Sequence, residues 1–416
     1  MAHPFVFWKG GFHGRLDHGT PVLPQNGSVS EPALSKSNGA SVVKTAVPPV
    51  RLSPMNFQAR QRKLRDHLAT TQFDALLVSH LPNIRYLCGF TGSSGLLLIE
   101  ESGSVFFTDV RYDTQAHAEV KAAKVVIARQ AVLNAAGERL ASLRGKKAIG
   151  IEADHVTVSD RKRLNDLLPS RLRLKNSSSL VERARMVKDE DELAFIRNAV
   201  NLGAKLFDRA LEVIRPGVKE SDVAAEMEYA ARRAGAQEMS FPTIIASGER
   251  SALPHGRASE KPIKPGGFVV CDFGVILAGY CSDQTRTVWV GSASDDASAA
   301  YEAVLEAQLA AIAAASPGVS VGEVDAAARK VLRKRGLGRY FTHSTGHGVG
   351  LEIHESPRVA AGQKTVLQPG MVITIEPGVY FPGKWGIRIE DMVTVTARGC
   401  DVLTPTRKNF LAVSVS

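Results

Sequence analysis

From residue 55 onward, the chain alternates helical hydrophobic patterns with short apolar runs. The apolar runs of the first part are ALLVS from Ala75, GLLLIE from Gly95, SVFFT from Ser104, KVVIAR from Lys124 and KAIGIE from Lys147. Short runs rich in branched and aromatic residues, separated by helical segments, are typical of the strands of an α/β domain. The pattern therefore predicts an N-terminal α/β domain over residues 55–182.

Longer helical patterns and paired strand patterns follow in the second half. The expected helices cover residues 190–214, 221–234, 295–315 and 321–334, and the expected strands cover residues 268–273, 285–290, 372–376 and 387–395. Helices and strands in mixed order, with hairpin-like spacing, favour an α+β domain built on an antiparallel sheet. The predicted fold class of the whole chain is therefore α+β.

Two changes of composition divide the chain. Residues 1–54 are rich in Gly, Pro, Ser and Asn and show no sustained apolar periodicity, which predicts a disordered N-terminal extension. Its apolar patch FVFW is too short for the core of a signal peptide. The polar NSSS at 176–179 and the charged KDEDE at 188–192 mark the second change. We place that domain boundary near Arg183, which gives a second domain over residues 183–416.

Composition and charge narrow the functional classes. The chain has 416 residues, of which 44% are hydrophobic and 23% charged, and no apolar run reaches the length of a membrane helix. The net charge of +10 is spread over scattered Lys and Arg residues, which favours a basic solvated surface over nucleic-acid binding. The cysteines form no CxxC pair, so we expect neither disulfides nor a zinc knuckle, and a reducing cytoplasm fits best.

Acidic residues inside otherwise apolar strands of the second half are the strongest chemical signal. The candidates are Asp272 in CDFG, Asp283 in CSDQT, His347 in GHGVG, Glu376 in IEPG and Glu390 in RIED. Buried acids are costly unless they are paired, protonated or bound to a cation. Carboxylates with a single imidazole suit hard ions such as Mn²⁺. Each residue alone also fits a turn, an edge strand or the surface, so the residues by themselves indicate only a candidate metal site.

These motifs resemble those of the Xaa-Pro aminopeptidase and prolidase branch of the pita-bread metallopeptidases. That family has two aspartates eleven residues apart, a histidine in GHGxG, a glutamate in IEPG and a glutamate in RIED, and this chain contains all five. The resemblance covers about residues 55–416 and includes the stretches NIRYLCGFTGSSG and FTDVRY. It implies a creatinase-like α/β domain followed by a pita-bread catalytic domain.

The resemblance also implies a role for each of the five residues. Asp272 would bind one of two divalent ions, Asp283 and Glu390 would bridge both, and His347 with Glu376 would complete the site of the other. The ions would be Mn²⁺, with Co²⁺ or Zn²⁺ as alternatives. Water shared by the ions would attack the peptide bond, and Glu376 would move its proton to the leaving nitrogen.

Three further histidines are candidates for the substrate side. By resemblance, His255 in LPHG and His354 in IHESP would bind the peptide or the tetrahedral intermediate as catalytic and substrate-binding residues. The alternative for both is an ordinary loop histidine. His343, four residues before His347, is as well explained by a role in orienting its neighbours.

Two arginines complete the candidate site. Arg388 lies two residues before Glu390 on a predicted strand, and alternation places both on one face, so Arg388 is a candidate partner of a carboxylate and of the substrate. Arg358 lies four residues after His354 and is a candidate clamp for the carboxylate of a dipeptide. A solvent-exposed arginine is the alternative in each case.

The function implied is hydrolysis of the bond between an N-terminal residue and proline. The resemblance leaves open whether the substrate is a Xaa-Pro dipeptide or a longer peptide, and relatives are commonly homodimers. Methionine aminopeptidases normally lack a large α/β domain before the catalytic one, and creatine amidinohydrolase works without this metal set. The alternative from another class is a catalytically silent pita-bread scaffold that binds peptides or RNA.

Overall fold

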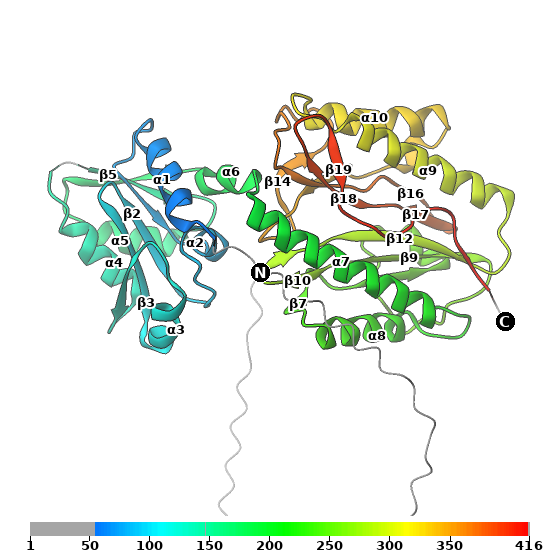
Figure 1. The fold of residues 1–416 in the computed structure, drawn as a ribbon, viewed down its shortest axis with the longest axis horizontal. Coiled ribbons are helices and arrows are strands. Elements are labelled where there is room, and N and C mark those ends of the chain that lie inside the picture. The colour runs from blue at the N-terminus through cyan, green and yellow to red at the C-terminus, as the bar shows by residue number, and fades with distance from the viewer. Residues whose placement is uncertain (1–54, 146, 415–416) are drawn as a thin grey trace, which may run out of the picture. The chain divides into compact units, whose positions relative to one another are not determined.

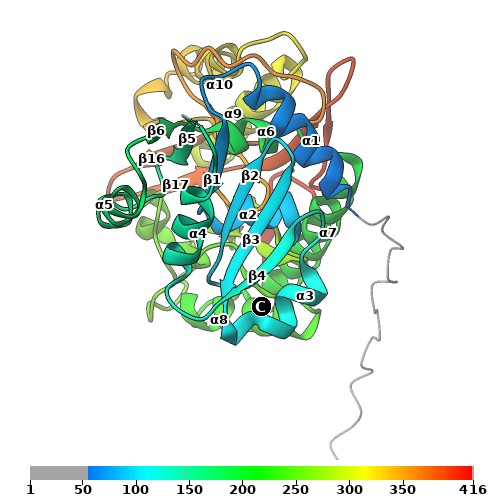
Figure 2. The ribbon, with the colours of Figure 1, turned by 90° about the vertical axis from the view of Figure 1, so that its left-hand side faces the viewer.

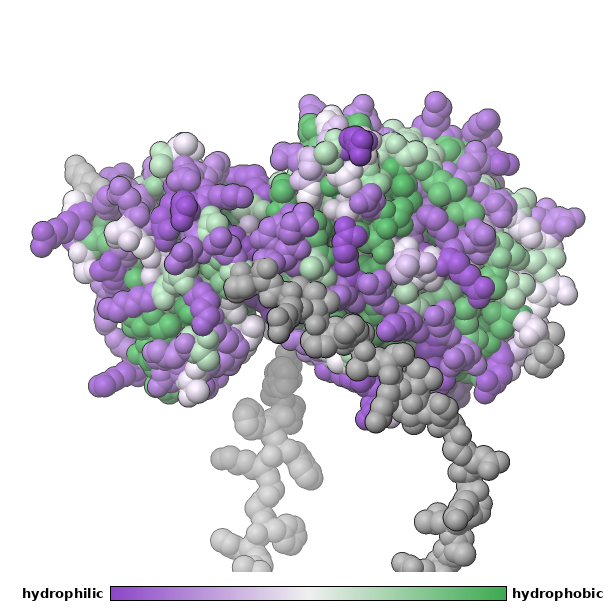
Figure 3. All heavy atoms as spheres, in the orientation of Figure 1, coloured by the Kyte–Doolittle hydropathy of each residue, from purple (hydrophilic) through white to green (hydrophobic). Residues whose placement is uncertain are grey.

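A computed structural model of the chain describes residues 55–145 and 147–414. The predicted extension over residues 1–54 lies outside the described residues. Within the described part, no helix combines the length and the apolar character that a membrane crossing requires. Hydrophilic residues are spread over the face shown in Figure 3, with hydrophobic residues between them.

A mixed six-stranded sheet forms the centre of the N-terminal part, in the order β4-β3-β2-β1-β5-β6 (Figure 2). Its strands are β1 (Ala75–Val78), β2 (Leu96–Glu100), β3 (Gly103–Asp109), β4 (Lys124–Ala128), β5 (Lys147–Glu152) and β6 (Leu172–Ser177). β1 pairs antiparallel with β2 and parallel with β5. The five strands expected from the apolar runs are confirmed, whereas β6, which is largely polar, was not predicted.

The strand β1 is apolar throughout because both faces of this sheet are covered. Successive side chains of a strand point to opposite faces. Leu76 and Val78 join the hydrophobic cluster beside the first two helices, and Ala75 and Leu77 join the cluster beside the fourth and fifth. The helices are α1 (Phe57–Leu68), α2 (Leu81–Cys88), α3 (Asp113–Glu119), α4 (Val132–Ala141), α5 (Val158–Leu167) and α6 (Leu180–Met186).

The C-terminal part places two helices on each side of its strands. Its helices are α7 (Glu190–Val213), α8 (Glu220–Arg233), α9 (Asp295–Ala314) and α10 (Val321–Lys334). One hydrophobic cluster joins α9 and α10 to the strands, and a second joins α7 and α8 to them from the other side (Figure 1). The four predicted helices are confirmed, with ends within two residues of those expected.

Two larger antiparallel sheets carry this part, as predicted. One has the order β20-β12-β9-β8, in which only β20 runs parallel to its neighbour, and the other has the order β14-β13-β15-β18-β19. β7, β10 and β11 form a small sheet, and β16 pairs with β17. The strands are β7 (Glu238–Met239), β8 (Ile244–Ser247), β9 (Gly267–Phe273), β10 (Val275–Leu277), β11 (Tyr280–Cys281), β12 (Gln284–Val290), β13 (Gly346–Gly348), β14 (Glu355–Val359), β15 (Val372–Ile375), β16 (Gly378–Phe381), β17 (Trp385–Arg388), β18 (Asp391–Val395), β19 (Cys400–Val402) and β20 (Ala412–Val413).

One strand prediction was wrong. The single strand expected over residues 387–395 is two strands, β17 and β18, which belong to different sheets. The break falls at Ile389 and Glu390, whose backbone N–H groups donate to Pro377 and Thr285 respectively, so the ladder does not continue through them. The domain boundary expected near Arg183 falls inside helix α6, and the exact domain bounds stay a prediction.

Candidate metal centre and active site

Asp272, Asp283 and Glu390 meet where the two larger sheets adjoin. Asp272 lies in β9 opposite Thr285 of β12, and Asp283 directly precedes β12. Glu390 donates its backbone N–H to the carbonyl oxygen of Thr285 at 3.1 Å, and its Oε2 accepts from the Thr285 hydroxyl at 2.7 Å. Residues separated by more than 100 positions are thus held side by side by one threonine of a central strand.

The glycines on either side of His347 allow its strand to fit between two neighbours. A Cβ atom on Gly346 would lie 2.0 Å from the carbonyl oxygen of Thr374, and one on Gly348 would lie 2.3 Å from that of Ser356. Both distances are far below any van der Waals contact with backbone. The GHG sequence is therefore required for the close approach that brings His347 into the site.

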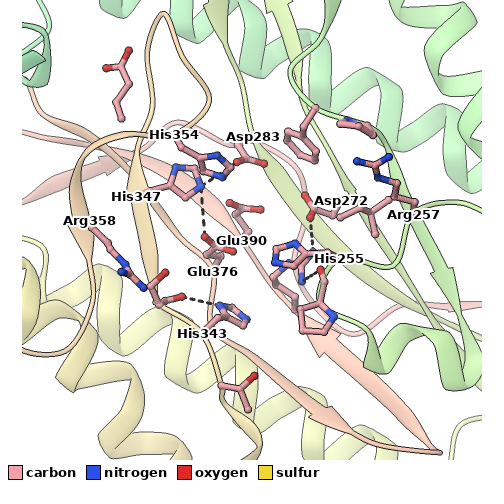
Figure 4. A pocket seen from close by; sticks show the side chains of 18 of the residues that line it. His255, Arg257, Asp272, Asp283, His343, His347, His354, Arg358, Glu376 and Glu390 are labelled. Carbon is pink, nitrogen blue, oxygen red and sulfur yellow. Dashed lines mark hydrogen bonds and ion pairs between the residues drawn. The ribbon is translucent and has the colours of Figure 1, made fainter. Parts of the chain in front are cut away.

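The His347 ring is oriented for coordination through Nε2. Its Nδ1 lies 3.0 Å from the carbonyl oxygen of Gly348, so Nδ1 carries the proton and Nε2 keeps a lone pair. Nε2 faces Asp283 Oδ2 at 3.5 Å and Glu376 Oε1 at 3.6 Å (Figure 4). One ligand atom each of Asp283, His347 and Glu390 lie within 4.8 Å of one another.

The protonation equilibria reflect several acids in one buried place. Burial, followed by the repulsion of the other carboxylates, raises the pKa values of Asp283 and Glu390 well above their usual range. Burial also raises the pKa of Glu376 to about 8, although Arg388 opposes the rise. Burial lowers the pKa of His347 to about 4, so the imidazole is neutral at pH 7. The raised pKa values of the three carboxyl groups reflect the cost of burying their ionised forms, which a bound cation would relieve, and the neutral imidazole is the form that can bind one.

Arg388 is the buried cation of this site, and its partner is Asp272. The guanidinium also donates to the Tyr380 hydroxyl at 2.7 Å and to the Thr285 hydroxyl at 3.1 Å. His343 extends the chain of contacts, since its Nε2 lies 2.9 Å from the same Tyr380 oxygen. Arg388 therefore contacts a carboxylate as expected. The His343 ring contacts Tyr380, which fits a role in orienting its neighbours, and that role stays a prediction.

The donor set fits divalent metal ions. Asp272 Oδ1 and Asp283 Oδ1 are buried, and neither has a hydrogen-bond partner among the described residues. A buried carboxylate oxygen without a partner is costly, and a cation is the partner that several such oxygens can share. Four carboxylates with one neutral imidazole are also the ligands that hard divalent ions prefer.

A cavity of about 860 Å³ opens from this cluster and brings together every residue predicted for the site. Besides the five acidic and histidine candidates, it is lined by His255, His343, His354 and Arg358 (Figure 4). Arg388 also lines it. His255, His354 and Arg358 are exposed to it. The His354 ring packs edge-on against the His347 ring, with centroids 4.4 Å apart.

One wall of this cavity is apolar and was not predicted from the sequence. Phe241, Pro242, Ile244 and Pro254 line it, as does Arg257. The sequence feature that corresponds to this wall is the run SFPTII at residues 240–245, which leads into β8. In β8, Ile244 pairs with Asp272 of β9. The run could be connected with the acids only through that pairing, which no local pattern reveals.

Both parts of the chain match known protein families. Residues 194–397 match metallopeptidase family M24, and residues 60–187 match the creatinase/prolidase N-terminal domain. A Xaa-Pro dipeptidase of Pyrococcus horikoshii is 37% identical over 357 residues, which cover 84% of this chain and 98% of that protein. The chain belongs to metallopeptidase family M24. Membership of this family implies divalent metal ions, in agreement with the donor set.

Solved structures of M24 relatives share the whole described architecture. A Xaa-Pro dipeptidase from Bacillus anthracis is 39% identical with a TM-score of 0.83, covering 86% of this chain and all of that one. An X-Pro aminopeptidase from Thermotoga maritima is 36% identical with a TM-score of 0.77, covering 84% and 99% respectively. The predicted family and its two-part fold are therefore confirmed for this M24 metallopeptidase.

Proposed function

We propose that this M24 metallopeptidase hydrolyses the bond between an N-terminal residue and a following proline. The observation that carries the proposal is one cavity in which a carboxylate cluster adjoins an apolar wall and an arginine, Arg358, that has no ion-pair partner among the described residues. The wall of Phe241, Pro242 and Ile244 suits a pyrrolidine ring, which has no N–H to hydrogen-bond. The names of the relatives, two dipeptidases and an aminopeptidase acting on X-Pro, point the same way.

The residues assigned to two divalent ions are the same five. Asp272 would hold one ion, His347 and Glu376 the other, and Asp283 and Glu390 would bridge them. When bound, such ions would lower the pKa of a coordinated water and polarise the scissile carbonyl. Mn²⁺ is the proposed metal because carboxylates dominate the donor set, with Co²⁺ or Zn²⁺ as alternatives. Restoring each metal separately to metal-free protein and measuring Xaa-Pro hydrolysis tests this choice.

The protein side chains supply proton transfer and orientation. Glu376 accepts the proton of the attacking water and delivers it to the prolyl nitrogen, which must be protonated to leave. His255 and His354 face the cavity from two different loops and donate hydrogen bonds to the substrate carbonyl as negative charge develops on its oxygen. Arg388 holds Asp272 in place and lines the same cavity, where it is also a candidate to bind the substrate.

Arg358 distinguishes dipeptides from longer peptides in this proposal. It is exposed in the cavity, and within residues 55–145 and 147–414 no carboxylate lies within ion-pair distance of it. A free guanidinium can hold the carboxylate of a Xaa-Pro dipeptide with two hydrogen bonds. A longer peptide has an amide at this position and gains no such contact. We therefore propose Xaa-Pro dipeptides as the preferred substrates.

The test compares Arg358→Ala with Arg257→Ala on Xaa-Pro and Xaa-Pro-Xaa substrates. Figure 4 shows the two arginines at opposite ends of the labelled group, so Arg257 is a control for the loss of one positive charge. We expect kcat/KM of Arg358→Ala to fall about ten- to a hundredfold on dipeptides, the value of one charge-assisted contact, and little on tripeptides. Equal losses on both substrates, or in both variants, would exclude the clamp.

We further propose that the protein is a cytoplasmic homodimer and that it binds neither nucleic acid nor membranes. All four cysteines are free, and three of them are buried, which supports a reducing compartment. Light scattering of the purified protein tests the homodimer. Metal content of the same sample separates the enzyme from the silent scaffold, because a scaffold would hold no stoichiometric metal.

A further inference from the structure

Ionisable residues from both parts of the chain surround the short segment that contains Glu352 and His354 and leads into β14. Arg185 of α6 is buried, with 2% of its surface exposed, and its Nη2 contacts Glu355 and, at 2.8 Å, Glu352 Oε2. Its Nη1 donates to Asn83 Oδ1 at 2.7 Å. His80 Nε2 lies 3.0 Å from the same Glu352 oxygen. We call Arg185, His80, Glu352 and Glu355 the loop clamp.

The loop clamp fixes the conformation of the segment as well as its place. Glu355 Oε1 accepts the backbone N–H of Glu352 at 3.0 Å, which closes the turn between them. Lys188 lies 3.3 Å from the other oxygen of Glu355, so that carboxylate is held from two sides. Although burial raises the pKa of Glu352, the neighbouring His80 and Arg185 outweigh it and lower that pKa to about 2. The carboxylate is thus ionised, and held by charge, throughout the neutral range.

His354 lies inside the segment that the loop clamp holds. No hydrogen bond or ion pair to another described residue fixes its ring, which only packs against His347. His354 lines the 860 Å³ cavity and also a second cavity of about 200 Å³, which Arg185, Glu352 and Glu355 line as well. The position of the His354 ring therefore depends on its backbone, and its backbone depends on Glu352 and Glu355.

We infer that Arg185, which lies in α6 near the end of the residues that match the creatinase/prolidase N-terminal domain, is a positioning residue for His354, acting through the loop clamp; this rests on the substrate role proposed for His354. Arg185 then contributes to turnover without touching the substrate. Displacement of a substrate-contacting group by about 1 Å can lower the rate a hundredfold, so loosening this segment lowers kcat more than it raises KM.

Arg60 provides a matched control. It is also a buried arginine that joins the two parts, with 5% exposed surface and an ion pair of 2.7 Å to Asp189 at the start of α7. It contacts neither Glu352 nor Glu355. Arg185→Met and Arg60→Met should both lower the melting temperature, because each removes a buried cation from a buried carboxylate. Arg60 pairs with the buried Glu192 at 3.3 Å, and without Arg185 the buried Glu355 keeps only Lys188. Only Arg185→Met should lower kcat, by about tenfold or more.

A double-mutant cycle separates positioning from general damage. If Arg185 acts through His354, Arg185→Met should change kcat less than about twofold in a His354→Ala background. Equal losses in both backgrounds, or equal losses from Arg185→Met and Arg60→Met, would overturn the inference. If Arg185→Met does not fold, Glu352→Gln replaces it in the cycle, because this carboxylate is 35% exposed and its removal is milder.

Hydrogen–deuterium exchange gives a readout that needs neither metal nor substrate. Exchange of residues 350–356 should increase in Arg185→Met and stay at the wild-type rate in Arg60→Met. Unchanged exchange in Arg185→Met would contradict the inference. Failure of the wild-type protein to cleave Xaa-Pro would instead contradict the proposed function, so the two failures are distinguishable.

Discussion

Removal of metal should make the stability of this protein depend on pH in a way that the metal-loaded form does not. The reason is Glu376, whose pKa rises from its usual 4.5 to about 8 through burial. A carboxyl group with a raised pKa binds more protons in the folded state than in the unfolded state. Its stabilising contribution is complete below pH 4.5 and is lost as the pH rises through 8.

The pH range of the measurement has to be chosen so that the titration of the histidines contributes little to the change in stability. Burial lowers the pKa values of His343 and His347 to about 4, so both stabilise the fold above pH 6.5 and lose that contribution as the pH falls. In the folded state both are neutral between pH 6.5 and 8, whereas in the unfolded state they are half protonated at pH 6.5, so each adds a smaller, opposite change of about 0.4 kcal/mol over this window. Over this window the contribution of Glu376 to the free energy of unfolding should fall by about 1.6 kcal/mol, or about 3 to 6 °C for a unit of about 200 residues. Asp283 and Glu390, whose pKa values are also raised, change stability in the same direction.

The assay is thermal unfolding of metal-free and Mn²⁺-loaded protein at several pH values from 6.5 to 8. Bound metal keeps the carboxylates ionised, so the loaded form should lack this slope and the gap between the two melting curves should widen with pH. Ionisation of buried thiols affects both forms alike and cancels in the gap. Glu376→Gln should reduce the slope of the metal-free form. Parallel curves for the two forms would refute the reasoning.

The other predictions concern the bridging ligands, a buried ion pair and the N-terminal extension. Asp283→Ala and Glu390→Ala should each abolish stoichiometric metal and peptidase activity, and normal metal content in either would show that the assignment is wrong. Asp391→Ala should cost about 3 to 5 kcal/mol in urea unfolding, because it leaves the buried Arg286 without its partner at 2.7 Å; a loss below 1 kcal/mol would contradict this. Deletion of residues 1–54 should leave melting temperature and activity unchanged, and a large drop in either would exclude the sequence-based expectation.

The candidate ligands could be selected from the sequence because each of them lies in a short, distinctive motif. Asp272, Asp283, His347, Glu376 and Glu390 each stand in a distinctive local context, and the cavity contains all five. The assignment of each to a metal stays a prediction until metal binding is measured. The helices of the second half were predictable for a similar reason, since their apolar positions repeat over many turns.

Contacts between distant residues were beyond local patterns. Arg388 was expected near a carboxylate because of its spacing from Glu390, yet its ion pair is with Asp272, 116 residues away. Tyr380 joins Arg388 to His343 and carries no motif that would single it out. Such pairings follow from which strands become neighbours, and alternation along one strand gives only the face of the sheet, not the partner.

The prediction of one strand over residues 387–395 failed for the same reason, because a contact with a distant residue interrupts it. This interruption lies at the candidate site. An apolar run with one acid reads as a continuous strand, but the backbone of Glu390 leaves the ladder to bond with Thr285 of the other sheet. A carboxylate in the middle of a regular strand would point from one face of its own sheet. The break between β17 and β18 lets Glu390 lie close to both Asp283 and His347, so the irregularity that the sequence pattern did not reveal brings candidate ligands from two sheets within 4.8 Å of one another.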